Sequence, residues 1–271
     1  MAKTKVLITV KTYPTISTKY EELVCTAGFR EDGTWIRIYP VQYRKKAYHE
    51  QYGKYHWIEI DLVKNESDFR PESYRPVTHD TEIKILHEIK ADGDDWTQRR
   101  KVVLNKIYYN LTELIAEAKD KTICTSLAVF KPTKIIDFIC EEVEREWDDK
   151  KLTVLQQYNL FDSATEGREE VVKKLPYKFS FVFQDIEGRE STLMIEDWET
   201  GALYWNMLKK TGNEEGACKA VRQKYFDDFS KTKDLHFYLG TSQTFHFVGH
   251  NPFMIIGTFH PKKITKLRLD L

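Results

Sequence analysis

Aromatic and basic residues alternate between Thr34 and Trp57 in a pattern that could bind nucleic acid. The whole chain is neutral, with 42 Lys and Arg against 42 Asp and Glu, but this segment carries several basic residues and the single acid Glu50. Stacking of a base on an aromatic side chain contributes about 1–3 kcal/mol, and neighbouring basic groups neutralise phosphates. We therefore predict binding of single-stranded or splayed DNA or RNA. The residues assigned to this binding are Trp35, Arg37, Tyr39, Arg44, Lys45, Lys46 and Trp57.

Three carboxylates follow one another closely at a predicted strand-to-helix junction. Glu196, Asp197 and Glu199 could hold a divalent cation, because hard cations prefer oxygen ligands. Such a metal could activate a water for phosphodiester hydrolysis. Asp197 also stands where a helix N-cap belongs, and capping is the simpler interpretation.

Several histidines gather near the C-terminal end of the chain. His236 lies in a predicted strand, whereas His246 and His250 share a polar loop with Ser242. Imidazoles can ligate a transition metal, and one beside a hydroxyl can act as a general base. We therefore take His236 as a metal-ligand candidate and His246, His250 and Ser242 as catalytic candidates. Their spacing matches no zinc signature, and histidines in polar loops are commonly exposed without a catalytic role.

These patterns leave three hypotheses for function. Nucleic-acid binding comes first, although the aromatic residues could simply form the core and rim of a small barrel. A metal-dependent phosphodiesterase or related hydrolase is the alternative, and it requires the carboxylates and histidines to converge in space. A scaffold that binds other proteins through exposed aromatics is the third. A divalent metal belongs to the second hypothesis only, and no other cofactor is predicted.

Several functional classes lack their sequence signatures. No GxGxxG or GxxxxGK[ST] motif is present, which argues against a dinucleotide or P-loop site. No CxxC pair occurs among Cys25, Cys124, Cys140 and Cys218, so we predict reduced thiols rather than a zinc finger or a disulfide framework. No apolar run approaches the ~20 residues of a membrane span. We therefore expect a cytoplasmic protein without a membrane partner.

The first ninety residues read as five short strands separated by turn signals. They suggest a small closed or half-closed β-barrel. Because side chains alternate along a strand, Trp35, Arg37 and Tyr39 share one face, which we expect to be visible to solvent. The predicted strands are residues 6–10, 22–26, 34–39, 56–62 and 82–86.

The rest of the chain changes its pattern. Apolar residues at spacings of three and four from Asp95 to Lys119 predict one helix, capped by Asp94 or Asp95. A strand is predicted over residues 135–140. The last hundred residues predict a hairpin (177–183 and 191–195), two helices of which the second is capped by Asn213, and closing strands 235–239 and 253–259.

The predicted fold class is α+β. It combines an N-terminal small antiparallel β-barrel (residues 1–92), a helical connector with one strand (93–165) and a C-terminal ββααββ domain (166–271). The acidic run 141–149 and the polar stretch 162–170 read as the main domain boundary.

Overall fold

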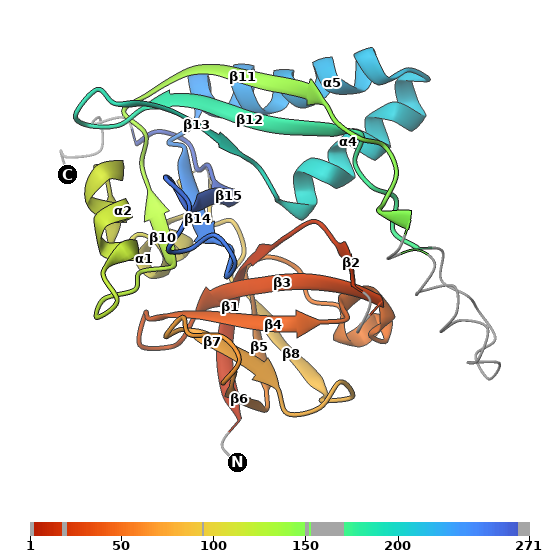
Figure 1. The fold of residues 1–271 in the computed structure, drawn as a ribbon, viewed down its shortest axis with the longest axis vertical. Helices are drawn as coiled ribbons and strands as arrows, with labels where there is room; N and C mark the ends of the chain where they lie inside the picture. Colours follow the sequence, from red (N-terminus) through yellow and green to blue (C-terminus); the bar gives the residue numbers. More distant parts are fainter. Residues whose placement is uncertain (1–2, 18–20, 94, 150–151, 153–170, 265–271) are drawn as a thin grey trace.

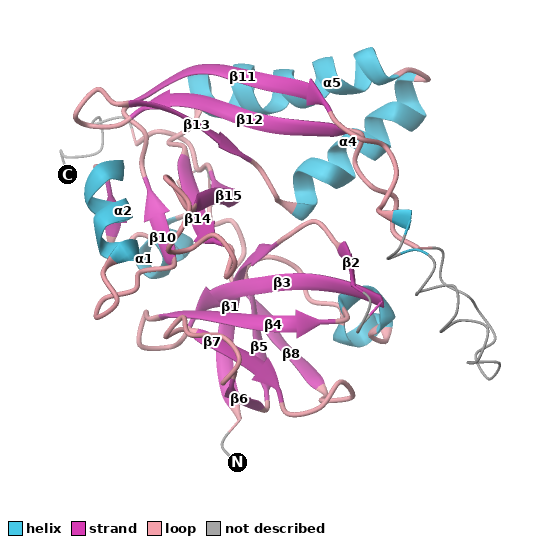
Figure 2. Ribbon diagram, in the orientation of Figure 1, coloured by secondary structure: helices cyan, strands magenta, loops and turns pink. Residues whose placement is uncertain are grey.

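A computed structural model describes residues 3–17, 21–93, 95–149, 152 and 171–264 of the chain. The fold is mixed α+β, and sheets make up most of its regular structure (Figures 1 and 2). An N-terminal sheet lies at one end of the molecule, and two smaller sheets with the longer helices lie at the other (Figure 1). The predicted polar boundary at 162–170 lies outside the described residues.

The N-terminal half is an eight-stranded sheet in the order β6-β7-β4-β3-β1-β5-β8, with β2 paired to β3. Its described pairings are antiparallel except that of β4 with β7. Its strands are β1 (Thr4–Lys11), β2 (Thr15–Ser17), β3 (Glu21–Phe29), β4 (Trp35–Val41), β5 (His56–Ile60), β6 (Leu62–Lys64), β7 (Ser73–Pro76) and β8 (Ile83–Glu88).

The path of the chain explains why this sheet curls. Only Asp61 separates β5 from β6, yet β6 forms one edge of the sheet and β5 lies next to the other edge. One bent segment therefore brings the two edges toward each other. The apolar side chains of Val6, Ile36 and Ile58 are buried in the resulting half-barrel. The predicted barrel is thus a curled half-barrel, and all five predicted strands are present.

Two smaller sheets form the C-terminal half. One has the order β15-β14-β10-β9 and the other β11-β12-β13. Their strands are β9 (Ile107–Tyr108), β10 (Leu127–Phe130), β11 (Lys134–Glu142), β12 (Tyr177–Gln184), β13 (Glu190–Met194), β14 (His236–Thr241) and β15 (Phe253–Phe259). The helices are α1 (Thr97–Val103), α2 (Leu111–Lys119), α4 (Trp198–Thr211), α5 (Glu214–Arg222) and the π-helix η3 (Gln223–Ser230). The predicted ββααββ order is present, but its two hairpins belong to different sheets.

The single helix predicted from Asp95 to Lys119 is wrong. The segment contains α1, then β9 paired in parallel with β10, then α2. Asn110 begins α2, where its side chain accepts the backbone N–H groups of Thr112 and Glu113. Asp95 is not the cap of α1, since Trp96 holds that position, and the other predicted cap, Asp94, lies outside the described residues. The region expected to be a connector with one strand supplies β9, β10 and β11 to the C-terminal sheets.

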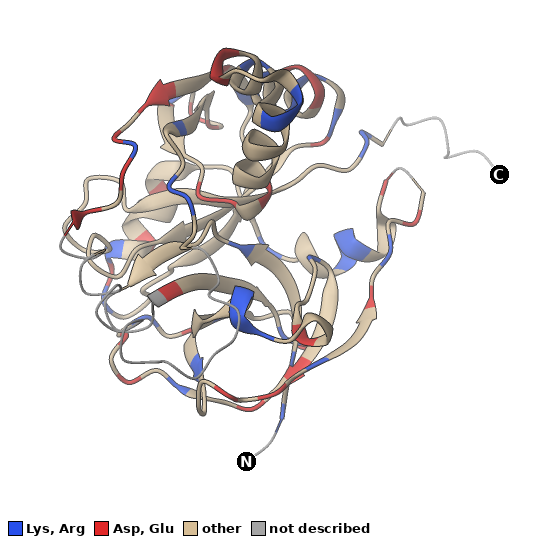
Figure 3. Ribbon diagram, turned by 90° about the vertical axis from the view of Figure 1, so that its right-hand side faces the viewer, with Lys and Arg blue, Asp and Glu red and all other residues tan. Residues whose placement is uncertain are grey.

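The two halves share an apolar layer. Val10 and Phe29 of the half-barrel pack in one cluster with Val129, Tyr238 and Phe259 of the C-terminal half. In the view of Figure 3, acidic and basic positions are interspersed over both halves. No helix within the described part of the chain is long and apolar enough to cross a membrane.

Candidate functional site at the junction of the halves

The strand face predicted to be open to solvent is covered by the C-terminal half at Trp35 and Arg37. The ring of Trp35 lies 4.0 Å from that of Phe29 and 6.0 Å from that of Tyr238. The Arg37 side chain is 3% exposed, and it donates hydrogen bonds to Ser126 Oγ at 2.8 Å and Ser126 O at 3.2 Å. These hydrogen bonds compensate the cost of burying the guanidinium. The prediction that Arg37 lies on an open surface is therefore wrong.

The other predicted binding residues lie nearer the surface. Arg44 donates to Glu22 at 2.7 Å, and Lys46 donates to the carbonyl oxygen of Thr81 at 2.9 Å. Lys45 is exposed, and Trp57 is half-buried in β5. Arg44 and Lys45 belong to a single 3₁₀ turn, η1 (Tyr43–Lys45), that follows β4 directly, and Lys46 comes next. We call residues 44–46 the basic turn.

A pocket of about 320 Å³ opens where β4, β14 and β15 meet, and we call it the junction pocket. Arg37, Tyr39 and Arg70 line it from the half-barrel, and Thr241 and Ser242 line it from the C-terminal half. Leu23, Met254 and Ile256 contribute apolar wall, and Thr12, Thr15 and Thr244 contribute further hydroxyls. The pocket thus combines an apolar wall with many fixed hydrogen-bonding groups.

A buried network holds the polar wall of the junction pocket in place. Arg70 donates to both carboxylate oxygens of Asp68, at 2.8 and 2.6 Å, and also to the carbonyl oxygen of Thr241. The hydroxyl of Thr241 lies 2.7 Å from His246 Nδ1, and His246 Nε2 lies 2.7 Å from the carbonyl oxygen of Ala118. Because a carbonyl only accepts, Nε2 carries the hydrogen and Nδ1 accepts from Thr241. Ala118 therefore fixes the ring of His246 through Nε2, and His246 orients the hydroxyl of Thr241 through Nδ1.

A second, larger groove adjoins the junction pocket. Its volume is about 810 Å³, and it shares Tyr39 and Gln243 with the junction pocket. Arg75 and His79 lie along this groove. Gln243 is fixed at the boundary, since its side-chain amide donates to the carbonyl oxygen of Ser67 at 2.6 Å. Tyr39 and Gln243 thus belong to the wall of both the groove and the junction pocket.

The predicted carboxylate cluster is divided between two sides of the chain. Glu196 lines the junction pocket, and burial raises the pKa of its carboxyl group. Asp197 and Glu199 instead meet the ammonium group of Lys54. Consecutive side chains of an extended segment point to opposite sides, which separates Glu196 from Asp197.

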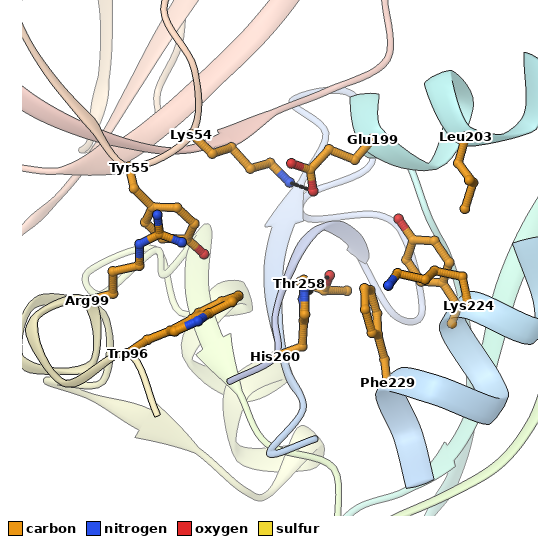
Figure 4. Close-up of a pocket in the computed structure, with 11 residues that line it drawn as sticks. Lys54, Tyr55, Trp96, Arg99, Glu199, Leu203, Lys224, Phe229, Thr258 and His260 are labelled. Atoms are coloured by element: carbon orange, nitrogen blue, oxygen red, sulfur yellow. Dashed lines mark hydrogen bonds and ion pairs between the residues drawn. The ribbon is translucent and has the colours of Figure 1, made fainter. Parts of the chain in front are cut away.

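Lys54 binds both of the remaining carboxylates, and Figure 4 shows its contact with Glu199. Its Nζ is 2.9 and 3.1 Å from the two oxygens of Asp197 and 2.9 Å from Glu199 Oε2. Asp197 has the position of an N-cap but makes no capping hydrogen bond, because its carboxylate is turned toward Lys54. The predicted position of the N-cap is therefore confirmed, while the carboxylate itself binds Lys54. The ammonium group also takes the place between the carboxylates that a metal would need.

The charges of this cluster depend on one another. Burial raises the pKa of Asp197 to about 6, although attraction by Lys54 opposes the rise. Burial acts against the charged form of Lys54, but Asp197 and Glu199 outweigh it and raise the pKa of the ammonium group. The cluster lies beside a cavity of about 460 Å³, which Trp96, Arg99, Phe229 and His260 also line (Figure 4). His260 stacks on Phe229 with ring centroids 3.7 Å apart, and burial lowers the pKa of His260 to about 3.

Of the remaining candidates, Ser242 shares the junction pocket with Glu196, whereas His236 and His250 do not line it. His236 is buried with Nδ1 3.0 Å from the carbonyl oxygen of Asp234, and burial lowers the pKa of His236 to about 4. His250 is exposed in the loop before β15, and Ser242 accepts the backbone N–H of Phe245 at 3.3 Å. Within the described ranges, no group of three or more His, Cys, Asp and Glu side chains could hold a metal ion. The convergence that the hydrolase hypothesis requires is therefore not observed there.

Two protein-family models match the chain, one over its N-terminal part and one over its C-terminal part. A family described as "Domain of unknown function (DUF8757)" matches residues 107–271. The chain belongs to this DUF8757 family. A second model, "Domain of unknown function (DUF8758)", matches residues 2–105. A search of the curated proteins finds no match. The junction pocket therefore takes Arg37 and Tyr39 from the DUF8758 region and Thr241 from the DUF8757 region.

Sequence reasoning missed Arg70 and Lys54 as site residues. Arg70 follows Asp68 by two positions, and this spacing was the one local signal of their ion pair. Lys54 stands in the aromatic and basic segment, but its partners lie 143 and 145 positions away in the DUF8757 region. No local pattern identifies partners at that separation.

Proposed function

We propose that the chain binds single-stranded or splayed nucleic acid, with one base entering the junction pocket. The observation that supports this proposal is a pocket of about 320 Å³ that shares the aromatic side chain of Tyr39 with a larger adjoining groove. Sites for small ligands commonly measure about 300–1,000 Å³, so the pocket has room for a single nucleotide unit and none for a duplex. Single-strand recognition typically combines stacking on an aromatic ring with hydrogen bonds to the edges of a base.

The charges near the pocket suit this division of roles. Asp68 binds Arg70, and Glu72 lies 3.8 Å from Arg37, so both buried guanidinium groups are compensated. A pocket of this kind favours a neutral, polar base over a free anion. Phosphate groups would meet the basic turn, which Lys46 ties to the carbonyl oxygen of Thr81, the residue that follows His79 and Asp80 of the adjoining groove.

The test is fluorescence anisotropy of labelled single-stranded oligonucleotides, titrated at several salt concentrations. Tyr39→Leu should weaken binding about 5- to 150-fold, because stacking contributes about 1–3 kcal/mol per base. Lys45→Ala with Lys46→Ala should flatten the salt slope, by about 0.7 for each lost phosphate contact. A matched control removes two exposed lysines of α4, Lys209→Ala with Lys210→Ala, and should leave the slope unchanged.

Two outcomes would contradict the proposal. The first is a lack of binding to any oligonucleotide at low salt by a folded protein. The second is an equal loss in the two double-lysine variants, which would indicate attraction by general charge. Capture of a protein partner without affinity for nucleic acid would favour the scaffold hypothesis instead. The division into residues 1–92, 93–165 and 166–271 is also a proposal, and limited proteolysis tests it.

A further inference from the structure

Two cysteines that the sequence separates widely meet between β11 and α5. Cys140 lies in β11, Cys218 lies in α5, and their sulfur atoms are 2.7 Å apart. Both thiols are free and half-buried. The separation is shorter than an ordinary non-bonded contact, and a disulfide requires about 2.03–2.05 Å. A small movement would therefore allow a covalent bond.

Contacts on both sides of the thiols hold the two elements in register. At the start of α5, Glu214 binds Arg145, which follows β11, at 2.6 and 2.8 Å. At the end of α5, Arg222 lies 2.7 Å from Asp137 and donates to the carbonyl oxygen of Phe138. The helix and the strand thus run antiparallel, with the cysteines between the two flanking contacts.

The repeats of the helix and the strand agree along this contact. Glu214, Cys218 and Arg222 are four positions apart, so they share one helix face and advance about 6 Å per step. Phe138 and Cys140 are two positions apart in β11, so they share one strand face and advance about 6.6 Å per step. The thiols face each other because four residues of α5 and two residues of β11 span nearly the same distance. The Glu214–Arg145 and Arg222–Asp137 ion pairs fix this alignment.

We propose that Cys140 and Cys218 form a reversible disulfide when the protein meets a small-molecule disulfide such as glutathione disulfide. The Cys140 thiol donates a hydrogen bond to Cys218 Sγ, which favours Cys218 as the attacking thiolate. Cys218 attacks one sulfur of glutathione disulfide and releases one glutathione thiolate. Cys140 then loses its proton to solvent and attacks Cys218 Sγ in the mixed disulfide, which releases the second glutathione. The two cysteines lose two electrons, and one glutathione disulfide is reduced to two thiols.

The rate of this exchange should depend on pH. Burial raises the pKa of Cys218, although the hydrogen bond from Cys140 opposes the rise, and burial also raises the pKa of Cys140. Because the thiolate is the reactive form, exchange is slow at neutral pH and faster as pH rises. The pair therefore behaves as a slow structural lock between α5 and the three-stranded sheet.

The experiment maps the linkage in the native, full-length protein. Reduced protein is equilibrated in glutathione buffers of increasing oxidised fraction, quenched by alkylation, digested with trypsin and analysed by mass spectrometry without reduction. The expected product joins peptide 135–145, which holds Cys140, to peptide 211–219, which holds Cys218. Cys140→Ser should stop at a glutathione adduct on Cys218, and the control Cys25→Ser should still form the linked pair.

The wild-type digest decides the matter even if a variant fails to fold. Separate alkylation of Cys140 and Cys218 in the most oxidising buffer, while circular dichroism reports the native fold, would overturn the proposal. Linkage of either residue mainly to Cys25 or Cys124 would also overturn it.

Discussion

Removal of the Lys54 ammonium group should destabilise the protein far more than removal of an ordinary surface lysine. The Lys54 side chain is 6% exposed and that of Asp197 is 0% exposed, so Lys54→Met leaves a carboxylate buried without its cation. Breaking a buried ion pair from one side costs about 3–5 kcal/mol. In a protein of this size each kcal/mol lowers the melting temperature by about 2–4 °C, so the expected loss is roughly 6–20 °C.

The assay is urea unfolding followed by tryptophan fluorescence, with Lys5→Met as the matched control. Lys5 pairs with Glu31 at 3.2 Å, but the two side chains are 44% and 65% exposed, so the control should lose less than about 1 kcal/mol. Adding Asp197→Leu to Lys54→Met should restore part of the stability, because the buried charge is then gone.

The deficit of Lys54→Met should also grow with pH. In the wild-type protein burial raises the pKa of Asp197 to about 6 against the attraction of Lys54, so loss of Lys54 raises it further. A carboxyl group with a raised folded-state pKa favours folding while it is protonated, and that contribution disappears as pH rises through the folded-state pKa. The variant should therefore lose less stability at pH 5 than at pH 8. Equal losses for Lys54→Met and Lys5→Met at pH 8 would refute this reasoning.

Three further outcomes are expected in equilibrium unfolding. A disulfide between Cys140 and Cys218 closes a loop of 78 positions and should stabilise the oxidised protein by up to about 4 kcal/mol. Equal urea midpoints for the oxidised and reduced forms would contradict this expectation. Burial lowers the pKa of His236 to about 4 from about 6.5 in the unfolded chain. The contribution of His236 to the free energy of unfolding is therefore fully present above pH 6.5 and falls by about 1.4 kcal/mol per pH unit below it. His236→Gln should flatten that slope between pH 6 and pH 4. The Asp185 carboxylate accepts three backbone N–H groups at 2.9–3.0 Å, one from Leu111 and two from the β12–β13 turn. Asp185→Ala should lower the free energy of unfolding by about 2–4 kcal/mol, and Asp185→Asn should lower it clearly less.

Local patterns predicted the strands and hairpins well, because alternation and turn residues act over short stretches of chain. The hairpin of β12 and β13 and the closing strands β14 and β15 are confirmed, as is Asn213, which accepts the backbone N–H of Gly216 at 2.7 Å. The predicted helix over residues 95–119 failed because a spacing of three and four continues across a turn and a short strand. Asn110 followed three positions later by Glu113 was the available signal that a new helix begins there.

The candidate site was less accessible to sequence reasoning, because its geometry depends on contacts between distant segments. Alternation correctly placed Trp35, Arg37 and Tyr39 on one face, but it carried no information about what covers that face. The cover on Arg37 comes from Ser126, 89 positions away. The carboxylates were likewise recognised as a group, while the cation that binds two of them lay 143 positions from Asp197.

The apolar layer between the halves has a consequence for how such genes can evolve. Val10 and Phe29 lie in the region matched by DUF8758, and Val129 and Tyr238, which pack in the same cluster, lie in the region matched by DUF8757. A product of either region alone would present this layer to water as an apolar patch, and large patches of that kind promote association or aggregation. Splitting the gene between the two regions should therefore be tolerated only if both products are made together and assemble as subunits. We expect the two coding regions to be inherited as one gene or as close neighbours.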